Sequence, residues 1–430
     1  MSLGRPRGRY APGWSHPGGG GYRPRMEGVQ AVFDPWSPDF VADPYPAYAE
    51  LRASGRVHYF APSDQWLVPR HADVAALLRD RRLGRTYRHR FTHEEFGRTA
   101  PPPEHEPFHV LNDNGMLDLE APAHTRIRRL VSKAFTARTV ERLRPYVEAL
   151  ADRLAADLVA DGGGDLVARV AEPLPVAVIA EMLGIPEADR HVLRPWSAAI
   201  CGMYELNPPE ETARRAVAAS LEFSGYLREL IAARRSAPGN DLISGLIAAY
   251  DEGESLSEQE MISTCVLLLN AGHEATVNAT ANGWYALFRH PEQLAALRAA
   301  PAALLPTAVE ELLRHDTPLQ LFERWVLDDI EIGGTVVPRG SEVALLFGSA
   351  NHDPAAFDHP ERLDLARKDN PHISFSAGIH YCIGAPLARI ELAASLAALL
   401  RRAPDLRLAA TPERKPNFVI RGLRELLVAV

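Results

Sequence analysis

The sequence predicts a mainly α-helical protein with small β-sheets, folded as a single domain over residues 36–430. Two observations carry this prediction. Apolar residues recur at helical spacing through most of the chain, and strand-like alternation is confined to short stretches near residue 60 and after residue 322. No internal repeat and no linker interrupts residues 36–430, so we expect one integrated unit.

The expected elements follow one another along the chain. Residues 44–53 and 71–80 have the pattern of amphipathic helices, and the stretch 56–69 between them alternates like short strands. Residues 84–118 lack clear periodicity and are predicted as a long loop of the kind that often forms a lid. Helical patterns then dominate up to residue 315: 122–135, 138–160, 173–183, 187–201, 210–235, 240–251, 257–288, 291–299 and 304–315. The remaining patterns are strands at 323–332, 335–337 and 341–346, a helix at 385–402, and strands within 405–430.

Residues 1–26 are rich in glycine, proline and arginine. Such a composition cannot bury much apolar surface, so we expect a disordered tail. It carries no apolar segment of the kind found in a signal peptide. Met1 and Met26 are both possible starting residues of the natural chain.

The bulk composition limits the function. The chain has 47 basic and 55 acidic residues, a formal net charge of −8, which argues against a general nucleic-acid binder. No run of about 18 apolar residues is present, so no membrane span is expected. The three cysteines, Cys201, Cys265 and Cys382, form no CxxC pair, which favours a reducing compartment. We therefore expect a cytoplasmic monomer that acts on small molecules.

Cys382 lies in the segment SFSAGIHYCIGAPLAR, residues 374–389, directly before a predicted helix. Gly378 and Gly384 allow a tight turn and a close approach to a flat ligand. The positive end of a helix dipole near Cys382 favours its thiolate, which is the form that binds soft metals and haem iron. A lone cysteine is more often an inert core residue, so the argument depends on the pattern around it.

This segment resembles the haem-binding signature of cytochromes P450, F-x-x-G-x-[HR]-x-C-x-G-x-x-L-A-R. The matching positions include Phe375, Gly378, His380, Cys382 and Gly384. The globular part of the chain is similar to the soluble, actinobacterial-type bacterial branch of that family. The resemblance implies a cytochrome P450 fold enclosing haem b, with Cys382 as the thiolate ligand of the iron.

A second motif, EELLR at residues 310–314, matches the E-x-x-R motif of the same family through Glu311 and Arg314. Residues three apart share one helix face and can pair, although an exposed surface pair would look the same. The resemblance implies a structural role, in which this helix is fixed to the segment that contains Pro360, Glu361 and Arg362.

Haem carries two propionate groups, which need cationic or hydrogen-bonding partners when they are buried. His124 and Arg128, one helical turn apart, match the H-x-x-x-R arrangement of the family, and Arg324 and His380 match two further positions. Each alone could be a surface cation. The resemblance implies that the four residues together bind the propionates.

The helix predicted over residues 257–288 contains LLLNAGHEATVN. The family pattern here is [AG]-G-x-[DE]-T, and Ala271, Gly272 and Glu274 match it. Small residues allow a planar group to approach, although they would equally serve helix packing. We expect Ala271 to contact the cofactor and Glu274 to pass protons. The next position is Ala275 where relatives have threonine, and Thr276 follows it.

The missing threonine matters because its hydroxyl steadies dioxygen and helps deliver protons in most relatives. Thr276 is turned by about 100° around the helix, so it is expected to be a poor direct substitute for that hydroxyl. Three alternatives remain. A substrate hydroxyl or an ordered water completes the relay, as in some macrolide-hydroxylating relatives; the reaction depends less on the relay; or the enzyme is slow and releases peroxide. We favour the first alternative.

Four segments are expected to line the substrate pocket by resemblance: the loop within 84–118, helix residues 267–276, residues 319–322 and residues 419–422. The candidate substrate contacts are Asn270, Leu319, Phe322 and Ile420. Asn270 lies one turn before Glu274, and its amide bonds either to the substrate or within the helix bundle. The His-rich loop and Arg421 suggest a polar or acidic substrate.

The leading hypothesis is a monooxygenase that uses O2 to hydroxylate a small or medium organic molecule in secondary metabolism. Electrons would come from a separate ferredoxin and its reductase, because the sequence has no flavin or iron–sulfur segment. Epoxidation and oxidative coupling are alternatives within this class. A haem-free activator protein would lack the cysteine ligand, whereas Cys382 is present, and a haem gas sensor would need no acid such as Glu274.

Overall fold

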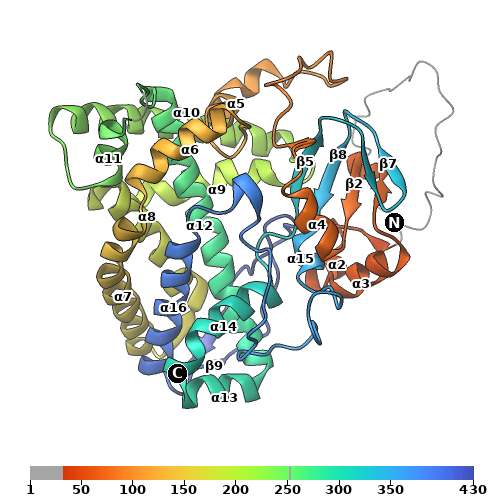
Figure 1. The fold of residues 1–430 in the computed structure, drawn as a ribbon. Coiled ribbons are helices and arrows are strands. Elements are labelled where there is room, and N and C mark those ends of the chain that lie inside the picture. Colours follow the sequence, from red (N-terminus) through yellow and green to blue (C-terminus); the bar gives the residue numbers. More distant parts are fainter. Residues whose placement is uncertain (1–31, 251–252) are drawn as a thin grey trace, which may run out of the picture.

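The computed structural model describes residues 32–250 and 253–430 (Figure 1). The expected tail over residues 1–26, including Met26, lies outside them. The helices are α2 (Pro38–Ala42), α3 (Tyr45–Ser54), α4 (His71–Leu77), α5 (Glu106–Asp113), α6 (Ala123–Ala134), α7 (Ala137–Ala160), α8 (Pro173–Leu183), α9 (Leu193–Cys201), α10 (Glu210–Ser236), α11 (Leu242–Ala248), α12 (Glu258–Arg289), α13 (Pro291–Ala299), α14 (Pro301–His315), α15 (Phe347–Ala350) and α16 (Ala385–Arg402). The strands are β1 (His58–Phe60), β2 (Gln65–Val68), β3 (Leu83–Gly84), β4 (Gly163–Asp165), β5 (Phe322–Val326), β6 (Ile330–Ile332), β7 (Thr335–Val337), β8 (Glu342–Leu345), β9 (Arg407–Leu408) and β10 (Leu427–Ala429).

The long helix α12 runs through the middle of the helical part of the molecule (Figure 1). It begins at a capping box, in which the Ser257 hydroxyl accepts from the Glu260 N–H and the Glu260 carboxylate accepts from the Ser257 N–H. These bonds satisfy two of the backbone donors that a helix start leaves free. Most of its residues from Met261 to Leu287 are buried, because α8, α9, α10, α14 and α16 pack around it.

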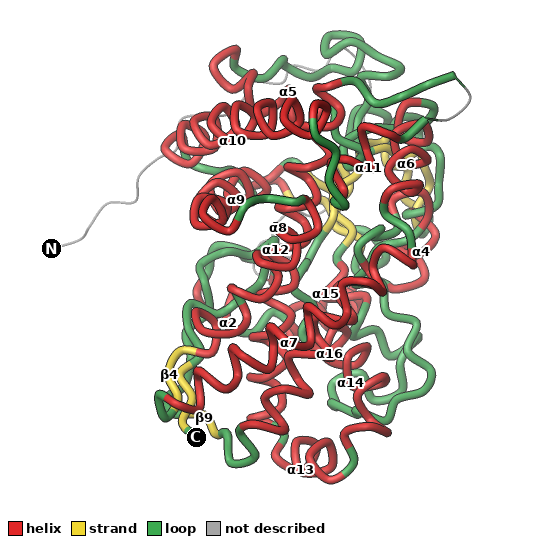
Figure 2. The backbone as a smooth tube through the Cα atoms, turned by 90° about the vertical axis from the view of Figure 1, so that its left-hand side faces the viewer, coloured by secondary structure: helices red, strands yellow, loops and turns green. Residues whose placement is uncertain are grey.

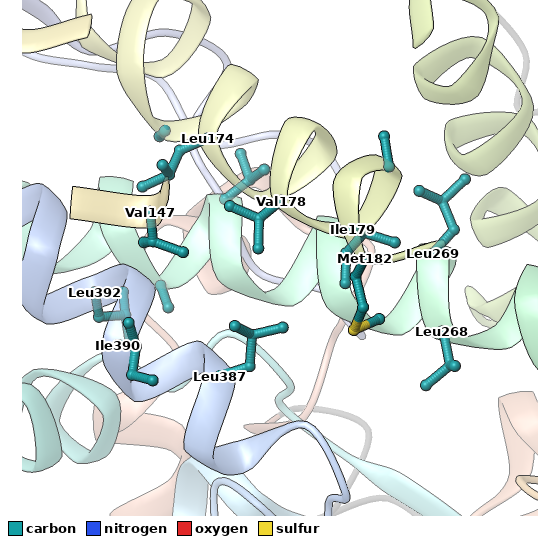
Figure 3. Packing of buried hydrophobic residues seen from close by; sticks show 14 of the residues in the cluster. Val147, Leu174, Val178, Ile179, Met182, Leu268, Leu269, Leu387, Ile390 and Leu392 are labelled. Atoms are coloured by element: carbon teal, nitrogen blue, oxygen red, sulfur yellow. The ribbon is translucent and has the colours of Figure 1, made fainter. Parts of the chain in front are cut away.

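The main hydrophobic core lies between α7, α8, α12 and α16 (Figure 3). Val178 and Met182 of α8 point into it, together with Leu387 of α16. The helices α8 and α12 come very close at Gly272, where an added Cβ would lie 2.8 Å from Cδ1 of Ile179. Glycine at this position therefore serves helix packing.

The strands form three small sheets. The largest has the order β1-β2-β8-β5-β3, in which only the β2–β8 pair is parallel, and it lies with α2, α3 and α4 on the side of the molecule opposite α7 and α8 (Figure 1). β10 pairs with β4 and β9 close to the C-terminus (Figure 2), and β6 and β7 form a hairpin. The prediction of a mainly helical chain with small sheets is confirmed.

Two predicted elements are wrong in detail. Residues 84–118, expected as a loop, contain helix α5, whose buried Phe108 and Leu111 are three residues apart and so share one face. Pro101 to Pro103 and the surrounding charges hid this short pattern. The expected strand 323–332 is two strands, β5 and β6, because the chain bends at Leu327 and Asp328. Within the described residues, no helix is both long and apolar enough to cross a membrane.

Candidate haem site

Cys382 lies at the end of a tight loop that precedes α16. Its backbone N–H donates to the carbonyl of Phe375 at 3.0 Å, which closes the loop. Gly378 has a φ of +69°, and an added Cβ would lie 2.5 Å from the carbonyl oxygen of Leu78. Only glycine fits there, because any side chain would strain the backbone and collide with main chain. The loop thereby places Cys382 on the wall of a cavity.

The surroundings of the Cys382 sulfur act on its ionisation in two opposite directions. Burial raises the pKa of this thiol, while the N–H groups of Gly384 and Ala385 and the charge of Arg128 act to lower it. These N–H groups at the start of α16 are the donors that stabilise a thiolate. A metal ion at the sulfur would overcome the cost of burial, because metal coordination deprotonates a thiol outright.

The cavity beside Cys382 has a volume of about 550 Å³, within the range of small-molecule sites. The cysteine loop and the first turns of α16 form one wall, and the middle of α12 forms another. Each of the four segments expected around the substrate contributes to the lining: Arg85, Met116 and Leu117; Asn270, Ala271, Gly272, Glu274, Ala275 and Thr276; Leu319 and Phe322; Val419 and Ile420.

Two expected sources of polarity are not in the cavity, so neither the histidines of residues 84–118 nor Arg421 supports the expected polar or acidic substrate. The histidines of residues 84–118 are absent from its lining. Arg421 is buried elsewhere, where its Nε donates to Asp316 at 2.8 Å and its Nη2 donates to the carbonyl of Ala42 at 2.8 Å. The buried carboxylate of Asp316 needs a cationic partner, and Arg421 supplies it at a place outside the cavity.

The four predicted propionate-binding residues gather near the cysteine loop. His124 and Arg324 are only 2% and 3% exposed, and neither ring nitrogen of His124 nor Nη2 of Arg324 has a hydrogen-bond partner. Burial, with the neighbouring His380 and Arg128, lowers the pKa of His124 to about 4. Burial and the nearby charge of Arg85 lower the pKa of Arg324 to about 9. Buried donors without acceptors are costly, and anionic carboxylates would satisfy them.

The other two members already have protein partners. His380 Nε2 lies 3.1 Å from Glu120 Oε1, and Arg128 donates to the carbonyl of Tyr381 at 2.7 Å. The His124 and His380 rings are 4.6 Å apart between centroids, so the structure brings these groups together. Glu120 is an acidic neighbour that the sequence patterns did not reveal. Arg128, His380 and Cys382 line the cavity, whereas His124 and Arg324 are absent from its lining and lie next to His380. The thiol and these free donors fit a planar group that carries a metal and carboxylates.

The α12 wall presents Ala271, Ala275 and Thr276 to the cavity. The expectation that Thr276 is turned away is only partly met, because Thr276 lines the same cavity as Ala275. Glu274 is 17% exposed in its side chain, with Lys415 Nζ at 3.9 Å and His273 Nδ1 at 4.0 Å. This acid therefore has charged neighbours as well as access to the cavity.

Asn270 is buried on the same wall. It is 3% exposed, and its Oδ1 has no hydrogen-bond partner. Its side chain lies near the Tyr204 hydroxyl, which donates to Asn112 Oδ1 at 3.3 Å. A second, very small cavity of about 10 Å³ borders Asn270, Tyr204 and Asn112. That volume and its polar lining suit a single water. The free Oδ1 of Asn270 can therefore accept a hydrogen bond either from a water in this small cavity or from a group in the larger cavity beside Cys382.

Glu311 and Arg314 are completely buried, not exposed on the surface. Arg314 Nη2 donates to Glu311 Oε1 at 2.7 Å, and its other N–H groups reach the carbonyls of Asn351, Pro360 and Arg362 at 2.8–3.1 Å. One guanidinium thus joins α14 to the segment 351–362.

The adjacent Glu310 fixes the cysteine loop from α14. Its carboxylate accepts two hydrogen bonds from Arg389 of α16, both at 2.7 Å. At the other end of the loop, the Ser374 hydroxyl donates to the carbonyl of Leu313 at 2.9 Å. The loop is therefore anchored to α14 on both sides of Cys382.

Four acidic residues of the cavity wall were missed by sequence reasoning: Glu205, Glu323, Glu342 and Glu391. Glu205 accepts from the backbone N–H groups of three consecutive residues, 418–420, at 3.0 Å each. Glu391 lies four residues after Leu387 on α16, and this spacing is the one signal that could have placed it beside the cavity.

Comparison with known proteins agrees with this geometry. Residues 191–417 match the family model described as cytochrome P450. The chain is 42% identical to "Cytochrome P450 monooxygenase PikC" of Streptomyces venezuelae, covering 90% of this chain and 91% of that protein. It is also 42% identical to "Nocardicin C N-oxygenase" of Nocardia uniformis subsp. tsuyamanensis, covering 89% and 94%.

A solved structure of P450BioI, in complex with an acyl carrier protein that carries hexadec-9Z-enoic acid, superposes with a TM-score of 0.85 at 35% identity. The match covers 92% of this chain and the whole of that one. Fold, cysteine loop and relatives agree: this chain belongs to the cytochrome P450 family, whose cofactor is haem, and to its bacterial monooxygenase branch.

Proposed function

We propose that this cytochrome P450 hydroxylates a small or medium organic molecule of secondary metabolism. The observation that carries the proposal is a single cavity bounded by Cys382, by small residues of α12 and by apolar side chains such as Leu319 and Phe322. The printed names of relatives support the setting, since one is an oxygenase of nocardicin C. Epoxidation or oxidative coupling remains the alternative, because both need the same haem chemistry.

Different residues are assigned to different parts of the cofactor. Cys382 ligates the iron, and Ala271 leaves room for the porphyrin. His124, and Arg324 through its unpartnered Nη2, hold propionates, with Arg128 and His380 beside them. Thiolate-ligated haem supplies oxygen activation, because the sulfur donates electron density that favours O–O cleavage. Electrons come from NAD(P)H through a separate ferredoxin and its reductase.

A haem-free activator protein is the competing function. It requires no thiolate, yet the loop around Cys382 is complete and contains Gly378 at a position where only glycine fits. The deciding experiment is the spectrum of the reduced, CO-bound protein. The red-shifted Soret band of a thiolate ligand is expected. Absence of this band from haem-loaded protein would rule out a monooxygenase. If the band is present, difference spectra against a compound library would identify substrates.

Ala275 makes proton delivery the distinctive feature of this enzyme. We propose that a substrate hydroxyl or an ordered water replaces the missing threonine hydroxyl, with Glu274 as the acid and Thr276 at the edge of the path. Replacing Ala275 with threonine is therefore expected to change the fraction of electrons that enter product by less than about twofold. The measurement compares product formed with NADPH consumed. A large rise in this coupling without a change of product would argue against substrate assistance.

Asn270 is the proposed polar contact for the substrate, because its Oδ1 is buried and free. A substrate hydroxyl or N–H would satisfy that oxygen. Asn270→Leu is expected to weaken substrate binding by about 10-fold, the usual cost of one lost hydrogen bond to a buried group. Spectral titration measures the affinity. Unchanged affinity would assign Asn270 to the small water-sized cavity beside Tyr204.

A further inference from the structure

The connection between α9 and α10 closes one side of the cavity. Five consecutive residues of this α9–α10 segment, 203–207, line the cavity. Among the described residues, no backbone–backbone hydrogen bond involves residues 205–208. The position of the segment over the cavity therefore depends on what its side chains bind.

Glu205 supplies a polar contact that holds this segment to the C-terminal part of the chain. Its Oε2 accepts from the N–H groups of Phe418 and Val419, and its Oε1 accepts from the N–H of Ile420, each at 3.0 Å. Phe418 and Val419 are each only 5% exposed, so their N–H groups would be costly to leave without an acceptor. One side chain thus satisfies three consecutive backbone donors.

The C-terminal side of this contact is fixed to the rest of the protein. The Phe418 ring packs against Phe33 and Phe40, at centroid distances of 5.5 and 5.6 Å. The carbonyl of Val419 accepts from the Gln320 N–H at 2.9 Å. The α9–α10 segment has no comparable backbone support. When the contact breaks, this segment is therefore the part that moves.

We propose that the Glu205 carboxylate controls the entry of ligands into the cavity. While it accepts from the N–H groups of residues 418–420, the α9–α10 segment stays closed, and a molecule of substrate size passes when the three bonds break. The bonds join protein groups only, so their loss favours opening equally in the free and the occupied protein. Glu205 therefore sets how fast ligands exchange and not how tightly they bind. This role holds whichever reaction follows.

The first test measures ligand exchange in the haem-loaded protein. 4-Phenylimidazole binds haem iron through a nitrogen and shifts the Soret band, so stopped-flow absorbance gives both rate constants. Glu205→Ala is expected to raise the association and dissociation rate constants by about 10-fold each, the factor that one hydrogen bond to a charged group accounts for. The dissociation constant should change by less than about twofold, because it is the ratio of the two.

Two results of this experiment would overturn the proposal. The first is a pair of unchanged rate constants in Glu205→Ala, which would mean that ligands enter by another route. The second is a changed dissociation constant with an unchanged association rate constant, which would place Glu205 in contact with the ligand.

Two further variants separate the lost contact from other effects. Glu211→Ala removes an acid of α10 that is 59% exposed in its side chain and paired with Arg214, so both rate constants should stay unchanged. Met203→Ala shortens another cavity-lining side chain of the α9–α10 segment but leaves the three bonds in place. It should accelerate exchange far less than Glu205→Ala. Equal acceleration would mean that a wider opening admits the ligand, and the proposal would fail.

The second test needs no added ligand. Hydrogen exchange of the haem-loaded protein, read by mass spectrometry over residues 202–209 and 415–422, reports opening of the contact. Both stretches are expected to exchange at least ~10-fold faster in Glu205→Ala than in the wild type, and at the wild-type rate in Glu211→Ala. Unchanged exchange over residues 415–422 would show that Glu205 does not hold the segment. If the alanine variant does not fold, Glu205→Asp, which keeps the charge on a shorter side chain, should show a smaller acceleration in both tests.

Discussion

Replacing Cys382 with serine is expected to remove monooxygenation, lowering product formation by at least ~10²-fold, while the fold stays intact. Serine has nearly the shape of cysteine, and the loop is held by backbone contacts such as the Cys382 N–H bond to Phe375. A hydroxyl cannot supply the electron density that a thiolate gives to iron. The reduced, CO-bound variant should therefore lose the red-shifted Soret band, while circular dichroism should match the wild type.

The matched control is Cys265→Ala. Cys265 is buried within α12, and burial raises the pKa of its thiol to about 12, so it has no thiolate to offer. Its removal should leave the CO spectrum and the product unchanged. If Cys382→Ser kept the red-shifted band, Cys382 would not be the ligand. If Cys265→Ala abolished the band, the same conclusion would follow.

Arg314→Ala is expected to destabilise the protein by roughly 3–5 kcal/mol, the range for removal of one partner from a buried ion pair. Arg314 and Glu311 are both 0% exposed in their side chains, so the variant would leave a buried carboxylate whose remaining ion pair is with Arg367 Nε at 3.0 Å. Three backbone carbonyls would lose their donor as well. Urea unfolding of the haem-loaded protein, followed by circular dichroism and by haem absorbance, measures the effect.

The chain offers a control with the same Glu-x-x-Arg spacing on its surface. Glu141 and Arg144 of α7 also pair at 2.8 Å, but their side chains are 59% and 42% exposed. Arg144→Ala should hardly move the unfolding midpoint, because an exposed pair adds little. Equal effects of Arg144→Ala and Arg314→Ala would mean that burial is not what makes the Arg314 pair important.

The elements that could be predicted from the sequence are those whose pattern lies within one contiguous stretch of the chain. The cysteine loop was predictable because its glycines, its thiol and the helix start are contiguous. The long helix α12 was predictable because one apolar period runs through it. Helix α5 was missed because only two buried residues mark it among prolines and charges.

Contacts between distant segments were harder to foresee. Arg421 was expected in the substrate pocket, but Asp316, over 100 residues earlier in the chain, binds its guanidinium. Glu391 was missed because a single acid in an amphipathic helix is normally placed on the solvent side. The packing of α16 against α7, α12 and α14 turns this residue inward.

The anchoring of the cysteine loop has a consequence for electron transfer. The loop is tied to α14 before Cys382 by Ser374 and after it by the Arg389–Glu310 pair. As the proposed ligand of the iron, Cys382 held from both sides would move little when the iron gains or loses an electron. The reorganisation energy of the iron centre would therefore be low on the protein side. The speed of reduction then depends mainly on the redox potential of the electron donor and on how close that donor can come.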